Sequence, residues 1–159
     1  MRLTFRPLEK EHALAILNWR YALPYDCYNF NTDTIQEDLC YLLDPENAFY
    51  AILNPQGELE SYCSFGSDGQ VPGGDYGVEA LDIGMGIRPD LIGQGHGEQY
   101  AQAVVKYGAD RYGAQKLRVT IAAFNKRAQR VWGRLGFEHV EAFVKIGSGE
   151  EFVIMTCAL

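Results

Sequence analysis

The sequence lacks the features that mark membrane, secreted and nucleic-acid-binding proteins. No apolar run approaches the roughly 20 residues of a membrane-spanning helix. The first ten residues, MRLTFRPLEK, contain no apolar secretory core. Positive charge is also scarce, because 14 Lys and Arg oppose 21 Asp and Glu and the formal net charge is −7. We therefore expect a soluble, cytoplasmic protein with no nucleic-acid or membrane partner, since both partners require a basic surface.

Metal-binding and disulfide patterns are missing as well. The four cysteines form no C-x-x-C pair and no Cys/His cluster with the spacing of a zinc site. We expect reduced thiols and no metal. The length of 159 residues fits a single domain covering residues 1–159, and a content of 47% hydrophobic and 22% charged residues is typical of a globular one.

Strand and helix patterns alternate along the chain. The order β-α-α-β-β-β-α-β-α-β-β predicts an α+β protein, in which about four helices pack on a mixed, mostly antiparallel sheet of about seven strands. Residues 78–122 form one parallel strand–helix–strand unit. Thr34 and Glu37 predict a capping box before the second helix, and Asn125 is expected to cap the last one. Residues 66–77 are the segment most typical of a loop.

Three glycines stand directly before the third helix pattern, in Gly93-Gln94-Gly95-His96-Gly97. A glycine-rich turn between a strand and a helix directs free backbone amides at one point, where the helix dipole adds positive potential, and a phosphate is the natural ligand. The segment lacks the lysine and hydroxyl of a nucleotide P-loop and departs from the G-x-G-x-x-G spacing of dinucleotide-binding turns. Judged from these three glycines alone, a glycine-rich turn that binds no ligand remains an alternative.

Two blocks of sequence narrow this choice. Residues 87–97, IRPDLIGQGHG, resemble the acetyl-CoA-binding signature of the GNAT superfamily of N-acetyltransferases. Asn125-Lys126-Arg127-Ala128, followed by Trp132 and Gly136-Phe137, is similar to the second motif of that family. The separation of the blocks and the order of the elements also resemble the family. Ile92 and Trp132 depart from it, since Arg or Gln and Tyr are usual at these positions.

The resemblance implies an N-acetyltransferase that uses acetyl-CoA as co-substrate. Backbone groups of the central strand would then bind the thioester arm, and the glycine turn with the start of the last helix would bind the phosphates. The implied cofactor-binding residues are Met85, Gly86, Ile87, Ile92, Gly93, Gln94, Gly95, His96, Gly97, Glu98, Asn125 and Arg127.

Two carboxylates are candidates for the general base. Glu79 lies near the position where some members of the family carry a catalytic glutamate, and Asp82 stands in mid-strand, where a carboxylate is unusual. The alternatives are a solvated strand end for Glu79 and a hydrogen-bonded structural carboxylate for Asp82. The proton for the leaving thiolate would come from a tyrosine of residues 21–28 or from solvent, because the indole of Trp132 cannot act as an acid.

The acceptor amine is expected at the aromatic segment between the first two helices. Trp19, Tyr21, Tyr25 and Tyr28 are the candidate binding residues, and Asp26 adds one carboxylate. A plain hydrophobic cluster is the alternative. The expected partner is a small-molecule amine or a peptide, and the last hairpin has an edge that would allow a homodimer. A second hypothesis, a non-catalytic CoA-binding regulatory module, follows from Trp132.

Overall fold

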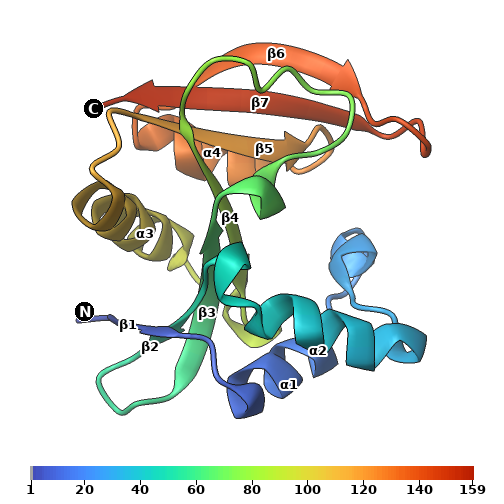
Figure 1. Ribbon diagram of the computed structural model, residues 1–159, viewed down its shortest axis with the longest axis vertical. Coiled ribbons are helices and arrows are strands. Elements are labelled where there is room, and N and C mark those ends of the chain that lie inside the picture. Colours follow the sequence, from blue (N-terminus) through green and yellow to red (C-terminus); the bar gives the residue numbers. More distant parts are fainter. Residues whose placement is uncertain (1) are drawn as a thin grey trace. The chain divides into compact units, whose positions relative to one another are not determined.

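The computed structural model describes residues 2–159, and its elements follow the predicted order (Figure 1). Helices and strands alternate as the hydrophobic periodicity indicates. In chain order they are β1 (Thr4–Pro7), α1 (Lys10–Asn18), α2 (Ile35–Leu43), β2 (Phe49–Leu53), β3 (Leu59–Phe65), β4 (Leu81–Ile87), α3 (Gly97–Tyr112), β5 (Lys116–Ala122), α4 (Lys126–Arg134), β6 (Glu138–Val144) and β7 (Glu151–Ala158).

The strands form one mixed sheet in the order β1-β2-β3-β4-β5-β7-β6. β4 and β5 are parallel, as a crossover through α3 requires, whereas β1 with β2, β5 with β7 and β6 with β7 are antiparallel. The predicted fold class is therefore confirmed.

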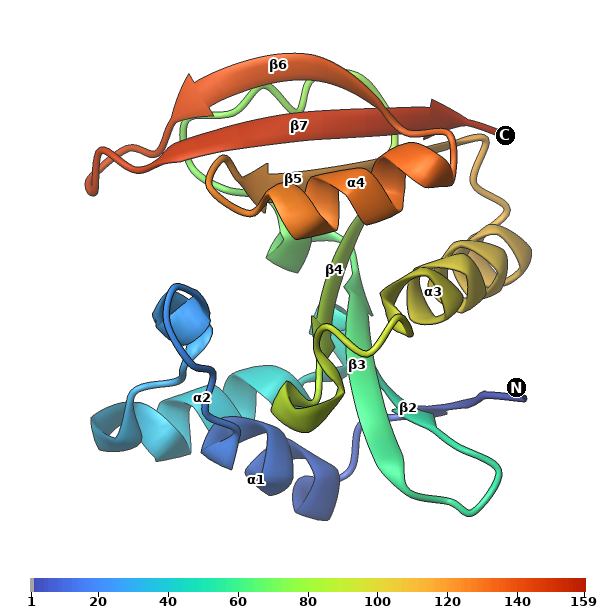
Figure 2. The same cartoon turned by 180° about the vertical axis from the view of Figure 1, so that it is seen from behind.

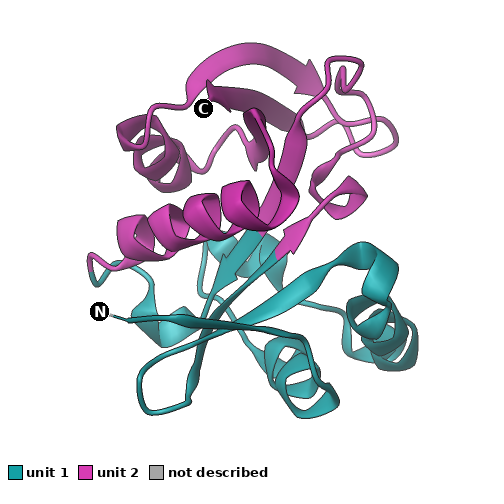
Figure 3. Ribbon diagram, turned by 60° about the vertical axis from the view of Figure 1, so that its left-hand side comes forward, with its two compact units in different colours: residues 1–63, 85–94 teal, residues 64–84, 95–159 magenta. Residues whose placement is uncertain are grey.

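The chain divides into two compact units, shown in different colours in Figure 3. Unit 1 contains residues 1–63 and 85–94, and unit 2 contains residues 64–84 and 95–159. The strands β3 and β4 run through both units. The prediction of a single domain stays a prediction.

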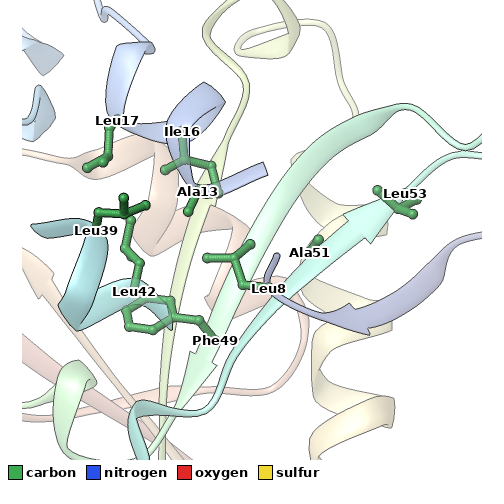
Figure 4. Close-up of a cluster of buried hydrophobic side chains, with 9 residues drawn as sticks. All are labelled: Leu8, Ala13, Ile16, Leu17, Leu39, Leu42, Phe49, Ala51 and Leu53. Carbon is green, nitrogen blue, oxygen red and sulfur yellow. The ribbon is translucent and has the colours of Figure 1, made fainter. Parts of the chain in front are cut away.

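The core of unit 1 joins α1 and α2 to the strand β2. Figure 4 shows the buried side chains that meet there, from Leu8, Ala13, Ile16, Leu17, Leu39, Leu42, Phe49, Ala51 and Leu53. Each fully buried leucine or isoleucine of this cluster contributes about 1.5–3 kcal/mol of transfer free energy. The cluster fixes the two helices that flank the aromatic segment.

The predicted capping box at α2 is wrong. The hydroxyl of Thr34 donates to the carboxylate of Asp38 at 2.7 Å and leaves the helix amides uncapped. A short 3₁₀ turn, Thr32–Thr34, precedes the helix, and Asn31 caps that turn by accepting from the amide of Asp33 at 2.8 Å. The capping function therefore lies three residues earlier than expected.

In unit 2, α3 and α4 pack against each other, and a long loop covers the other face of the strands. Figures 1 and 2 show α4 on one side of β5, β7 and β6 and residues 66–80 on the opposite side. The loop is attached to the sheet, since the amide of Ile146 donates to the carbonyl of Pro72 at 3.0 Å and the hydroxyls of Tyr76 and Thr120 are 2.9 Å apart.

Candidate functional site

The glycine turn has the backbone conformation that its sequence predicts. Pro89–Leu91 form one 3₁₀ turn after β4, and Gly93 and Gly95 then adopt φ values of 77° and 82°. Such positive φ values strain any other residue. A Cβ atom at Gly95 would meet nothing within 4 Å, so the turn presents its backbone to open space.

The amides that follow this turn are available to a ligand. Gln94 still donates within the turn, to the carbonyl of Leu91 at 3.4 Å, and the helical bonds begin at Tyr100, which donates to His96 at 3.2 Å. Within residues 2–159, the amides of residues 95–99 donate to no backbone carbonyl. His96 occupies the N-cap position without a side-chain cap. This helix start is therefore suited to bind an anion.

The sequence predicts that the amides of residues 92–98 bind the phosphates, but in the structure two of them already donate within the turn. The amide of Ile92 donates to the carbonyl of Pro89 at 3.3 Å, as that of Gln94 does to Leu91, so neither is left for a phosphate. The amides of Gly93, Gly95, His96, Gly97 and Glu98 remain, because none of them donates to a backbone carbonyl of the described residues.

The strand β4 offers backbone groups on the edge away from β3. The amide of Arg88 donates to Glu60 and the amide of Gly66 donates to Asp82, both at 2.9 Å. In an antiparallel pair the direction alternates along the strand, so Gly86 faces β3 whereas Met85 and Ile87 face away from it. Of the three predicted strand residues, Met85 and Ile87 are thus the two whose amides point away from β3.

Gly86 is required by its contact with β3. A Cβ atom at this position would collide with the ring of Tyr62. Its carbonyl accepts from the hydroxyl of Ser61 at 2.7 Å. Gly86 therefore allows β4 to pack closely against β3.

The aromatic segment of unit 1 is connected directly to the end of β4. The hydroxyl of Tyr21 donates to the carbonyl of Ile87 at 2.8 Å, and its amide donates to the side chain of Asn29 at 2.6 Å. Burial raises the pKa of the Tyr21 hydroxyl above its ordinary value, so this hydroxyl remains a proton donor at neutral pH. This contact joins the predicted acceptor segment to the predicted thioester strand.

The other aromatic candidates lie around Tyr21. Tyr28 contacts Tyr21 edge-on and stacks on Tyr25, with ring centroids 6.5 Å apart in both pairs. Tyr28 is 41% exposed, so its ring is accessible to a ligand. Trp19 packs on Tyr62 at 5.9 Å instead, and it thereby belongs to the hydrophobic core cluster.

The two candidate bases differ in their surroundings. Glu79 is exposed in the segment that leads into β4. Asp82 is 4% exposed, and its two carboxylate oxygens accept from Nε and Nη2 of Arg118 at 2.6 and 2.8 Å. Hydrogen bonding to Asp82 raises the pKa of the Arg118 guanidinium. A carboxylate held in this way is what the structural alternative for Asp82 expects.

The described residues contain neither a membrane-spanning helix nor a metal-binding cluster. None of the helices within residues 2–159 has the length and apolar character needed to cross a bilayer. In the same residues, no three His, Cys, Asp or Glu side chains gather as a metal site would require.

The comparison with family models decides the assignment. A model described as the acetyltransferase (GNAT) domain matches residues 2–138. The chain belongs to the GNAT family of acetyltransferases. It is therefore an enzyme that transfers an acetyl group to an amine, and its family uses acetyl-CoA as co-substrate.

Solved structures of GNAT proteins share the fold. A chimera of the spermidine N-acetyltransferase SpeG from Vibrio cholerae and hSSAT has a TM-score of 0.76 and 18% identity, covering 99% of this chain and 96% of the other. A GNAT-family acetyltransferase from Bacillus anthracis has a TM-score of 0.74 and 16% identity, covering 99% and 95%. None of the curated proteins matches the sequence.

The second GNAT motif of this enzyme lies at the start of α4. Asn125 caps the helix as predicted, because its side chain accepts from the amide of Ala128 at 3.0 Å. The side chains of Lys126 and Arg127 are exposed next to this cap. Trp132 is 5% exposed and packs edge-on against Phe137 at 5.1 Å. At the position where the family often has tyrosine, this acetyltransferase thus has a core residue.

Sequence reasoning missed Arg118 as the partner of Asp82 and Tyr62 as the support of Gly86. Like Asp82, Arg118 is a charged residue in the middle of an apolar strand, here Lys116–Ala122. Two such charges were a signal in the sequence for a buried ion pair. No comparable pattern in the sequence points to Tyr62.

Proposed function

We propose that this acetyltransferase acts on a primary amine, carried by a small molecule or by a protein N-terminus. The observation that supports the proposal most is the uncapped start of α3, where the amides of residues 95–98 donate to no backbone carbonyl and follow a turn that keeps the backbone open. The pyrophosphate of acetyl-CoA carries the charge and the acceptors that such a helix start binds.

The remaining cofactor residues take roles that their positions allow. Met85, through its backbone groups, and Ile87, through its amide, would pair with the amide groups of the pantetheine arm, while the carbonyl of Ile87 accepts from Tyr21. Lys126 and Arg127 would contact the nucleotide phosphates as exposed cations beside α4. Asn125 contributes to this region through its helix cap.

The amine would bind at the aromatic segment. Tyr25, Tyr28 and Asp26 offer ring faces and a carboxylate, which suit a cationic amine. The solved structures with this fold include enzymes described as spermidine N-acetyltransferases, so a polyamine is a reasonable first substrate to test.

Of the two candidate bases, Glu79 is the one that we propose. Its carboxylate is exposed and can accept a proton through water, whereas the oxygens of Asp82 are bonded to Arg118. The thiolate would be protonated by solvent or by a tyrosine of residues 21–28. Because the chain belongs to a family of acetyltransferases, we do not propose the non-catalytic module. Trp132 then matters only because its indole cannot supply the proton for the thiolate.

The test is to measure CoA binding by calorimetry and thiol release from acetyl-CoA with spermidine, simple primary amines and a peptide with a free N-terminus. Binding of CoA and thiol release with at least one primary amine are expected. Glu79→Gln should lower kcat about a hundredfold, the usual contribution of a general base, and leave the CoA affinity unchanged. Thiol release with none of these amines would contradict the proposed substrate class.

The cytoplasmic location, the single domain and a homodimer belong to the same proposal. β6 is the last strand in the sheet order, and Val140 and Val144 on it are 58% and 55% exposed. Pairing of this edge with a second copy would cover both side chains. Light scattering should give twice the chain mass, and Val144→Lys should lower it to that of one chain.

A further inference from the structure

The buried ion pair of unit 2 lies directly across two neighbouring strands. Asp82 of β4 is opposite Arg118 of β5 in the parallel register. The guanidinium binds the carboxylate through two nitrogens, at 2.6 and 2.8 Å, and the residues are 4% and 3% exposed. This bidentate geometry fixes both the distance and the orientation of the two side chains.

The pair lies where β4 and β5 stop pairing. The next rung of the register, Ile83 with Val119, is the last. β4 nevertheless continues to Ile87 and β5 to Ala122. The ion pair is therefore one residue before the end of the pairing between the two strands.

The loop of residues 66–80 adds three contacts to the pair. Gln70 donates to the second oxygen of Asp82 at 2.9 Å, and Nη1 of Arg118 donates to the carbonyl of Val78 at 2.7 Å. The guanidinium also lies over the ring of Tyr76, 4.9 Å from its centroid. The loop of residues 66–80 thus contacts the pair from the side opposite to α4, and of these contacts only the bidentate one links the two strands.

A buried ion pair of this kind adds little to the free energy of unfolding. Desolvation of two charges offsets most of their attraction, and an apolar pair of similar volume is often as stable. Fixed geometry is what the bidentate contact adds and what two apolar side chains would lack.

We propose that Asp82 and Arg118 are a positioning pair for acetyl-CoA, because they anchor β4 at the end of its paired segment and so orient the continuing strand, whose residues Met85 and Ile87 are proposed to bind the thioester arm. This inference rests on the proposed function. It assigns Asp82 to the cofactor side of the reaction instead of to proton transfer, and it assigns Arg118 a role that the sequence motifs do not include.

The main test is Arg118→Lys, which keeps the buried charge but loses the bidentate geometry. The Kd for CoA and the KM for acetyl-CoA should rise about tenfold, the scale of a misplaced binding element, while the KM for the amine and the melting temperature change little. A second variant, Asp82→Leu with Arg118→Met, removes both charges, is expected to fold and should show the same split.

Gln70→Ala is the matched control. It removes a hydrogen bond to the same carboxylate but leaves the link between the strands, so its CoA affinity should equal that of the wild type. Wild-type Kd and KM values for acetyl-CoA in both folded variants would overturn the proposal. An equal loss in kcat with both KM values unchanged would do so too. If the wild-type enzyme itself binds no CoA, the proposed function fails, and this inference fails with it.

Discussion

The helices α3 and α4 both begin in unit 2, but the N-cap side chain caps the first-turn amides at α4 and caps none at α3. At α4, the side chain of Asn125 accepts from the amide of Ala128 at 3.0 Å, and the helix supplies its own cap. At α3, His96 is in the equivalent position and caps nothing, after a turn built from glycines. Both starts carry the same partial positive charge.

The difference indicates what each helix start is for. A side-chain cap stabilises a helix without any other molecule, typically by about 1 kcal/mol. A helix without this cap gives up that stabilisation and keeps its amides for a ligand. We propose that in this acetyltransferase the start of α4 serves folding, whereas the start of α3 binds an anion of the cofactor. Four variants test that assignment.

The largest effect is expected when α3 receives a cap of its own. In His96→Asp the carboxylate would accept from the first-turn amides and repel the phosphates. The Kd for CoA should rise about thirtyfold, corresponding to roughly 2 kcal/mol at a partly buried helix terminus. Calorimetry measures this change.

His96→Asn is the control, since it adds the cap without the charge and should weaken binding less. Both variants should unfold at a slightly higher temperature than the wild type. Unchanged CoA affinity in His96→Asp would mean that these amides do not bind the phosphates.

Trp132→Tyr tests whether α4 contributes packing or chemistry. The smaller ring leaves space beside Phe137, and the free energy of unfolding should fall by about 2 kcal/mol, less than for truncation to alanine. The kcat for thiol release should stay within about twofold, because the indole is a donor that cannot act as an acid at neutral pH. A large gain in kcat would show that the missing hydroxyl limits the reaction.

Asn125→Ala removes the cap of α4. Chemical denaturation should show a loss of about 1 kcal/mol in unfolding free energy, the usual value of an N-cap. The affinity for CoA should be unchanged. A several-fold rise in Kd would instead support Asn125 as a direct cofactor contact, the role that the family motif implies.

The smallest effect is expected at the exposed cations beside that cap. Arg127→Ala should raise the Kd for CoA about twofold at low salt, in the range of exposed ion pairs, and the difference should vanish at high salt. Arg134→Ala, at the far end of α4, is the matched control. A difference that persists at high salt would assign Arg127 a closer contact with the cofactor.

Local signals made most of the fold predictable. Hydrophobic periodicity gives the strands and helices, and the glycines at 93 and 95 and the cap at Asn125 are visible as short patterns. The capping box at Thr34 failed because Thr34 ends a 3₁₀ turn, with φ −118° and ψ 25°, and so lacks the extended backbone of an N-cap residue.

Contacts between distant segments were not predictable in this way. Asp82 was noticeable as a charge in a strand, but its partner is 36 residues further along the chain. The bond between Tyr21 and Ile87 spans 66 residues, and only the register of the folded strand directs that carbonyl toward the aromatic segment. Candidate site residues therefore follow from motifs, whereas the contacts that hold them follow from the fold.

The path of the chain through its two units also limits how the enzyme can be divided. Since the chain passes between the units inside β3 after Cys63, inside β4 after Gly84 and in the glycine turn after Gln94, separating the units severs two strands. Neither part should fold when expressed without the other, and split reporters or swapped halves of this enzyme should be joined at surface turns such as residues 147–149 instead.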